Sequence, residues 1–225
     1  MHKWTTKVLT VLAAAAMLAS PVACTGHRAT VMEAPEKHDL QGLVQHGVTL
    51  YEQGQMDQAR RLLTRAVDRY MSENHRPNTV EATATARAQF HLAEMELAAW
   101  ESLKLQGSLG RQERILTDKL NGAQQLRTLY EKIYKYQDIH WILAARFRQG
   151  HIMQHFAQTL RDADIPFEPG TQEHQVYQNT LIDIAIPLED EAAGTYREVI
   201  KAAHMSDIKD SPWVARARIQ LSGLE

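Results

Sequence analysis

Two features of this sequence could support chemistry: a pair of histidines and a single cysteine. His151 and His155 lie four residues apart, so a helix would place both imidazoles on one face, a spacing that can present two ligands to zinc. A helical zinc-protease motif would need Glu directly after the first histidine, and the chain has Ile152 there. A third ligand would have to come from Asp162 or His174, and the sequence fixes neither. We therefore expect a structural role for both histidines, with a metal-binding or enzymatic role as the alternative.

The cysteine, Cys24, ends an N-terminal segment with the layout of a bacterial secretion signal. Two lysines precede an almost entirely apolar run at positions 8–19, and small residues lead from there to Cys24. The tetrapeptide Pro-Val-Ala-Cys at 21–24 resembles the lipobox of bacterial lipoproteins, in which the cysteine receives a diacylglycerol thioether and becomes the new N-terminus. A lipobox usually has Leu where Pro21 stands. The resemblance implies a signal peptide at 1–23 and lipidation of Cys24.

An ordinary cleaved signal and a retained membrane anchor are the alternatives to lipidation. Pro21 fits a small-x-small cleavage site poorly, and the apolar run is shorter than the roughly 20 residues that span a bilayer. By resemblance to enterobacterial sorting, Thr25 implies the outer membrane, because an inner-membrane retention signal would have Asp there. We therefore expect a protein on the periplasmic face of the outer membrane, held by its lipid and by a flexible tether at 24–37.

Composition limits what the rest of the chain can do. The sequence has 25 basic and 27 acidic residues, and without Lys3 and Lys7 the balance is 23 basic against 27 acidic. This balance predicts no basic footprint for nucleic acid or for an anionic membrane surface. A single cysteine allows no disulfide within the chain, so burial of a core must hold the fold together. Alanine, leucine and glutamine are abundant and β-branched runs are scarce, which predicts an all-α protein.

The strongest fold signal lies at residues 41–74. Apolar and small residues recur there at helical spacing on both sides of a turn at 53–57. The residues in question are Leu43, Gly47, Ala59, Leu63 and Ala66. This pattern resembles the tetratricopeptide repeat (TPR), a 34-residue helix–turn–helix unit, although Met71 stands where the closing Pro of the repeat would be. Gly47 and Ala59 take the small-residue positions at which the two helices approach closely.

Longer helices are expected to follow the same plan. They are predicted near 78–105, near 111–136, from about 140, from 171 with a kink at Pro187, and from 212. The expected caps are Asn78 with Glu81, Thr171, and Ser211 before Pro212, and the expected breakers after the third helix are Gly107 and Gly110. Leu120 and Ile184 are among the residues expected in the core. The predicted fold is a short TPR-like α-solenoid at 38–225, with about three helix pairs and a C-terminal capping helix.

A narrower resemblance covers roughly residues 80–222. Its matching features are Gly107-Ser108, Lys119, Tyr130, the segment 141–166, Tyr177, Leu181, the segment 187–189, Ala192, Tyr196 and Trp213. In these features the chain resembles TPR-containing envelope lipoproteins of deltaproteobacteria, which include components of the adventurous gliding-motility machinery. The resemblance implies a scaffold or adaptor at the inner face of the outer membrane.

The TPR resemblance also implies a partner-binding groove, because the first helix of each TPR pair lines a concave surface. The carried-over positions are Val44, Val48, Tyr51 and Glu52 from the first pair, Glu94 and Leu97 from the second, and Ile142, Arg146 and Gln149 from the third. Arg146 could pair with a carboxylate of an acidic partner segment, with a solvated helix face as the alternative. Two further expectations are a partly buried His46 and a helix that restarts at the acidic run 189–191.

No Gly-rich phosphate loop, nucleophile elbow or Cys/His metal framework occurs in the sequence. We expect a protein that is not an enzyme and that uses no cofactor, metal, nucleic acid or small-molecule substrate. The leading hypothesis is a lipid-anchored adaptor that binds other envelope proteins in an outer-membrane assembly of motility or secretion type. The alternatives are a pilotin-like escort for an outer-membrane channel, a metal-binding or enzymatic periplasmic protein that uses His151 and His155, and a structural lipoprotein that packs by its convex face.

Overall fold

Helices make up all of the regular structure in residues 39–225, which are the residues that the computed structural model describes. This range contains seven α-helices, one 3-10 turn and no strand. The elements are α1 (Leu40–Glu52), α2 (Met56–Ser72), α3 (Val80–Glu101), α4 (Leu109–Glu131), η1 (Tyr134–Tyr136), α5 (Ile139–Arg161), α6 (Gln172–Met205) and α7 (Pro212–Ser222). The all-α prediction is confirmed for this range, whereas Cys24 and the expected tether lie outside the described residues.

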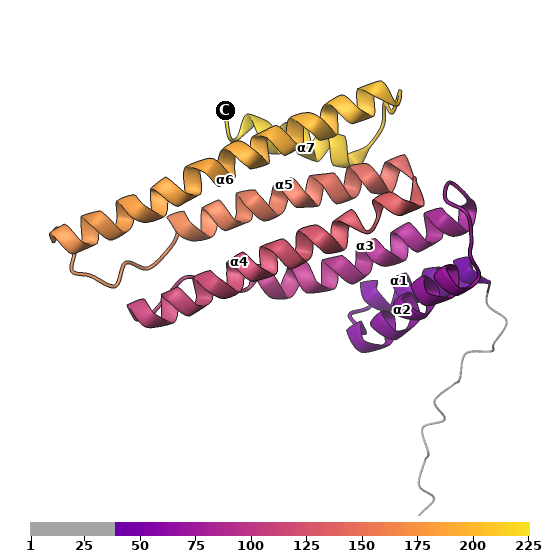
Figure 1. Cartoon of the computed structure of the whole chain (residues 1–225), viewed down its shortest axis with the longest axis horizontal. Helices are drawn as coiled ribbons and strands as arrows, with labels where there is room; N and C mark the ends of the chain where they lie inside the picture. Colours follow the sequence, from indigo (N-terminus) through magenta and orange to yellow (C-terminus); the bar gives the residue numbers. More distant parts are fainter. Residues whose placement is uncertain (1–38) are drawn as a thin grey trace, which may run out of the picture. The chain divides into compact units, whose positions relative to one another are not determined.

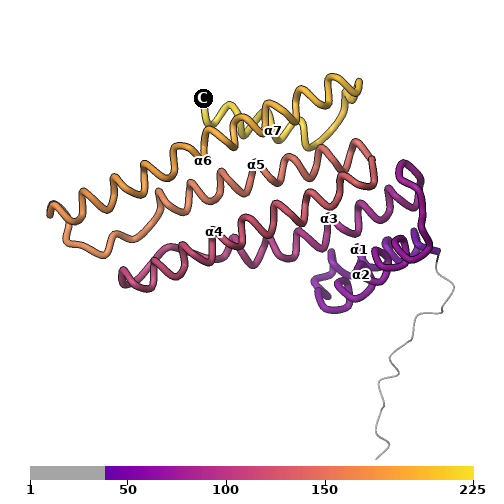
Figure 2. The backbone as a smooth tube through the Cα atoms, viewed as in Figure 1, coloured from indigo at the N-terminus to yellow at the C-terminus, as the bar shows by residue number. Residues whose placement is uncertain are grey.

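The helices pack in a regular order. Each α-helix packs against the next one in the chain, and α1 also packs against α3, α3 against α5, and α5 against α7. Figures 1 and 2 show α1–α2, α3–α4 and α5–α6 as antiparallel pairs that are followed by α7. The first pair is short, with helices of 13 and 17 residues, whereas α6 alone has 34. The odd-numbered helices therefore share one surface, to which each pair contributes its first helix.

Short polar side chains start most of the helices. Asp39, Thr79, Asp138 and Thr171 each accept a hydrogen bond from a backbone N–H in the first turn of the helix that follows. The last helix begins, as expected, with Ser211 at the cap position and Pro212 at the first helical position. Gly54, at φ 76°, supplies the left-handed residue of the turn between α1 and α2.

The close approach predicted for the first pair occurs at Gly47. A Cβ atom added to Gly47 would lie 2.8 Å from Leu63 Cδ2, which is too close for any side chain. Leu63 and its neighbours Ala59 and Ala66 are completely buried. The absence of a side chain at Gly47 therefore allows α1 to lie directly on the α2 residue that fills the centre of the pair.

Three predicted helix boundaries are wrong. Asn78 is not the cap of α3, because Thr79 caps the helix. Asn78 lies in the preceding loop, where its φ is 57° and its N–H donates a hydrogen bond to the Tyr136 carbonyl. Gly110 lies inside α4, so Gly107, at φ 92°, is the breaker of the two. The acidic run 189–191 starts no helix, because α6 continues through Pro187 as one element. Buried residues on both sides of the proline hold α6 in place despite the lost backbone hydrogen bond.

Three predictions of burial are also wrong. Leu120 is 61% exposed, and its neighbour Lys119 takes the buried position instead. Ile184 is 40% exposed next to the buried Ala185, and His46 is exposed next to the buried Gly47. Successive residues of a helix differ by about 100° around its axis, so an error of one position moves a side chain from the core to the surface.

Candidate functional site

The shared surface of α1, α3, α5 and α7 carries aromatic and polar side chains that are only partly covered. We call this surface the odd-helix face. Its members are Gln45 and Tyr51 of α1, Arg87, His91 and Glu94 of α3, Trp141 and Arg148 of α5, and Trp213 of α7. All are half-buried except Gln45, which is exposed. The face is the part of the described structure to which all four odd-numbered helices contribute.

A pocket of about 670 Å³ opens where α1, α3 and α5 meet. Arg87 donates a hydrogen bond of 2.9 Å to Gln45 Oε1, and Thr83 donates one of 2.7 Å to Asp138 Oδ2. These two bonds join the walls of the pocket, which is lined by Asp39, Gln41, Gly42, Val44, Gln45, Val80, Thr83, Ala84, Arg87 and Trp141. Side-chain amides, a guanidinium and an indole suit the backbone and the apolar side chains of an extended peptide.

Aromatic rings continue the face away from the pocket. The Phe90 ring of α3 lies 5.3 Å, centroid to centroid, from both Trp141 and Trp213. Tyr51 of α1 lies 4.9 Å from His91. Phe90 is buried and the two tryptophans are half-buried. One buried ring therefore supports two partly exposed indoles, which is the kind of rigid aromatic surface that anchors protein partners.

A charged pair lies beside these rings. Glu94 accepts hydrogen bonds from the Tyr130 hydroxyl and from the Arg148 guanidinium. The side chains of Arg148 and Glu94 are only 20% and 11% exposed, and the guanidinium lies 5.6 Å from the Trp213 ring centroid. Burial, helped by the charge of Glu94, raises the pKa of Tyr130 well above its ordinary value, so the hydroxyl remains a donor. The pair links α3 to α5, and Tyr130 links both to α4.

Two buried nitrogen atoms of the face, His91 Nδ1 and Arg148 Nε, have no hydrogen-bond partner within residues 39–225. Burial, with a further contribution from Arg87, lowers the pKa of His91 to about 4, so its ring is neutral at neutral pH. An unpaired buried polar atom costs about 1–3 kcal/mol.

The residues predicted for the groove divide into four groups. Tyr51 and Glu94 lie on the odd-helix face. Val44, Val48 and Leu97 are 1%, 0% and 2% exposed, so they belong to the core, although Val44 also forms part of the pocket floor. Glu52 is exposed at the end of α1, and Ile142 is half-buried on α5.

Arg146 and Gln149, the last two residues predicted for the groove, lie on another side of α5 than the odd-helix face. Arg146 donates to Glu198 of α6 at 2.6 Å, and Gln149 accepts from the Tyr134 hydroxyl at 2.6 Å. Both line a pocket of about 480 Å³ between α4, α5 and α6, together with Arg127, Glu131, Tyr134, Glu191, Gly194, Thr195 and Glu198. Arg148 is the α5 arginine that lies on the odd-helix face.

His151 and His155 are both engaged by polar neighbours. His151 Nε2 lies 2.6 Å from Glu101 Oε1, and His155 Nδ1 lies 3.3 Å from Nζ of the fully buried Lys119. Burial, and then Lys119, lower the pKa of His155 to about 4. Within residues 39–225 no group of three or more His, Cys, Asp or Glu side chains could hold a metal ion. A metal at these histidines would have to displace the carboxylate and the ammonium that now contact them.

An apolar groove of about 790 Å³ lies between α3 and α4 and is lined in part by Trp100, Leu103, Leu126 and Leu129. It is larger than the pocket of the odd-helix face. However, four helices contribute to the odd-helix face, and the two unpaired buried nitrogens of odd-numbered helices belong to its residues. We therefore take the odd-helix face, and not the apolar groove, as the candidate site.

Comparison of the chain with protein-family models, with curated proteins and with solved structures found no match. Within the described residues, no helix is both long and apolar enough to cross a membrane. The interpretation of function therefore depends on the geometry of the odd-helix face and on the N-terminal sequence pattern.

Proposed function

We propose that this protein is a lipid-anchored helical-repeat adaptor, which binds a segment of another envelope protein on the odd-helix face. Lipidation at Cys24, and with it the outer-membrane location, is supported by the sequence pattern alone, since residues 1–38 are not described. Attachment of the adaptor to a membrane would raise the local concentration of its partner there.

The order in which the helices pack supports a TPR-like solenoid. In such an array each helix contacts the next, and the first helices of successive pairs contact one another along the inner surface. The same order links α1 to α3, α3 to α5, and α5 to α7 in this chain. By this proposal the odd-helix face is the inner surface, and α7 closes the array.

One observation carries the binding proposal: the odd-helix face combines half-buried aromatic rings with a pocket and with two unpaired buried nitrogens. A surface with no partner would gain nothing from holding Trp141 and Trp213 half-exposed beside polar atoms that lack hydrogen bonds. The partner segment that fits this chemistry has an extended backbone, whose polar groups suit the side-chain amides and the guanidinium of the pocket, and at least one apolar side chain for the indoles.

Crosslinking followed by affinity capture from native envelopes tests the proposal. Gln41→Trp adds bulk at an exposed position in the pocket and Arg87→Glu reverses a charge in its wall, so each is expected to reduce capture of a defined partner at least about tenfold. Arg146→Glu is the matched control, because it reverses an arginine on another side of α5. Equal capture by wild type and both pocket variants would refute binding at this face.

The same experiment separates the remaining functional alternatives. Capture of an outer-membrane channel would identify the adaptor as a pilotin-like escort, and capture of motility or secretion components would identify it as part of such an assembly. Loss of capture in Arg146→Glu alone would instead favour binding on the side formed by α4 and α6.

A further inference from the structure

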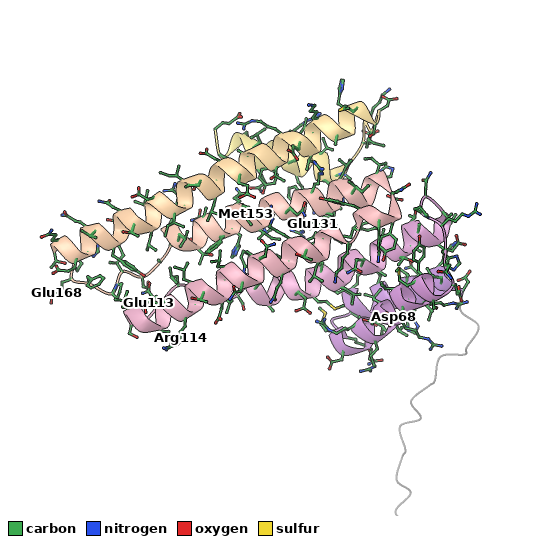
Figure 3. All side chains as sticks on the ribbon, viewed as in Figure 1. Asp68, Glu113, Arg114, Glu131, Met153 and Glu168 are labelled. Carbon is green, nitrogen blue, oxygen red and sulfur yellow. The ribbon has the colours of Figure 1, made fainter. Side chains whose placement is uncertain are left out.

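The second helix carries a concentration of positive charge on its outer side. Arg60, Arg61, Arg65 and Arg69 occur within ten residues of α2, and they line a shallow groove of about 670 Å³ with Thr64, Asp68 and Ser72. The inner side of α2 is apolar and buried against α1 and α3 through Ala59, Leu63, Ala66 and Tyr70. We call the seven groove residues the α2 arginine face; Figure 3 labels one of them, Asp68.

The arginines at the centre of this face are not neutralised by neighbours. Arg61 and Arg65 are exposed, lie one helical turn apart and make no salt bridge within the described part of the chain. Arg60 pairs with Glu96 at an exposed site, where its side chain is 47% accessible. Exposed pairs of this kind contribute little and exchange partners easily. Arg60 can therefore turn from Glu96 to an anion that approaches the face.

The charge is local, because residues 39–225 as a whole are acidic, with 21 basic and 25 acidic residues. Four of the 21 basic residues are on one side of a 17-residue helix that contains only two acidic residues, Asp57 and Asp68. The overall composition predicted no surface for an anionic membrane. Overall composition does not show where charges lie, so it could not reveal the local concentration of arginines on α2.

We propose that the α2 arginine face binds the phosphate groups of an anionic membrane surface. Guanidinium groups bind phosphate oxygens bidentately, and Thr64 and Ser72 line the same groove. The groove is shallow and Arg61 and Arg65 are exposed, so a surface of lipid headgroups can reach both guanidinium groups at once. The proposal goes beyond the adaptor function and does not require any partner on the odd-helix face.

The position of the face in the chain agrees with this arrangement. Only the fourteen residues 25–38 separate the predicted lipidation site from Asp39, a length that spans at most roughly 50 Å when fully extended. The α1–α2 pair is the first folded unit after this segment. A lipid at Cys24 would therefore keep the α2 arginine face within reach of the headgroups, so that lipid and charge act as two membrane signals.

Vesicle co-sedimentation tests the proposal without the lipid. The chain from residue 24 with Cys24→Ser, which retains the complete described body, is mixed with phosphatidylcholine vesicles with or without phosphatidylglycerol. Binding to the anionic vesicles alone, with a decrease at higher salt, is expected. The double variant Arg61→Gln/Arg65→Gln is expected to weaken this binding by roughly fivefold for each arginine.

The matched control removes two exposed arginines from α4, in the double variant Arg111→Gln/Arg114→Gln. Its net charge equals that of the α2 variant, and unchanged vesicle binding is expected. Equal binding of neutral and anionic vesicles, or equal losses in the two double variants, would overturn the proposal. Binding of the α2 arginine face to an acidic protein but not to anionic vesicles would also overturn it. Partner capture through the odd-helix face is measured separately, so failure of one proposal is distinguishable from failure of the other.

Discussion

Replacement of Lys119 by methionine is expected to stabilise this protein, because the lysine is buried as a cation. Its side chain is fully buried, with Nζ 3.3 Å from His155 Nδ1 and 4.1 Å from the centroid of the Trp100 ring. Burial lowers the pKa of Lys119 from 10.5 to about 8, although the charge of Glu101 opposes the shift. Neither contact therefore compensates fully for the water that the ammonium loses on folding.

The size of the effect follows from proton linkage. A pKa that is lower by about 2.5 units in the folded state corresponds to about 3 kcal/mol. Between about pH 8 and about pH 10.5 the unfolded chain retains a proton that folded Lys119 has lost, so the free energy of unfolding rises with pH in that window. Below about pH 8 both states are protonated and the whole cost is present. Lys119→Met keeps an unbranched side chain that is one atom shorter, and it should add about 2–3 kcal/mol at neutral pH.

Urea unfolding followed by circular dichroism measures this gain. The variant should exceed wild type at about pH 7, and the difference should shrink at about pH 10, where wild-type Lys119 is neutral in the folded state. Lys201→Met is the control, because Lys201 is an exposed lysine of α6 and its replacement should change stability by less than about 0.5 kcal/mol. A loss of stability in Lys119→Met at pH 7, or a gain that does not depend on pH, would refute the argument.

Two further predictions concern acid stability and helix packing. Because burial lowers the pKa values of His91 and His155 to about 4, each histidine should cost the folded state up to about 3 kcal/mol as the pH falls from about 6.5 to about 4. Thermal unfolding across this range should show the loss, and replacement of either histidine by glutamine should reduce it; an unchanged profile would contradict the assignment. Gly47→Ala should destabilise by about 1 kcal/mol, since a Cβ 2.8 Å from Leu63 outweighs the gain in helix propensity, whereas Gly194→Ala, with no atom within 4 Å, should stabilise by about 0.5–1 kcal/mol.

The sequence was most informative where periodicity and small residues agreed. Gly47 and Ala59 identified the packed centre of the first pair, and Thr171 and Ser211 identified helix starts that the structure confirms. These features depend on neighbours within one or two turns, which a single sequence displays directly. The assignment to the TPR family remains a prediction.

The candidate site was less predictable, because it depends on the rotation of each helix about its axis. Arg146 was predicted to line the partner-binding groove, whereas in the structure it pairs with Glu198 of α6 and Arg148 is the α5 arginine on the odd-helix face. The Glu94–Arg148 contact joins residues 54 positions apart, and the burial of Lys119 depends on helices whose contacts no local pattern specifies. The helices after the first pair are longer than those of a 34-residue repeat. Positions transferred from such a repeat therefore fall on a different side of these longer helices.

The two surfaces inferred here lie on different sets of helices, and this separation lets one molecule use both. The odd-helix face is built from α1, α3, α5 and α7, whereas the α2 arginine face is on an even-numbered helix whose apolar side is buried against α1 and α3. A partner in the pocket near Arg87 would therefore not compete with a membrane at Arg61 and Arg65. Changes at the two sites should then be independent: Arg87→Glu should reduce partner capture and leave vesicle binding intact, and Arg61→Gln/Arg65→Gln should do the reverse. If either variant impaired both activities, the two surfaces would be coupled and the adaptor could not hold membrane and partner at separate sites.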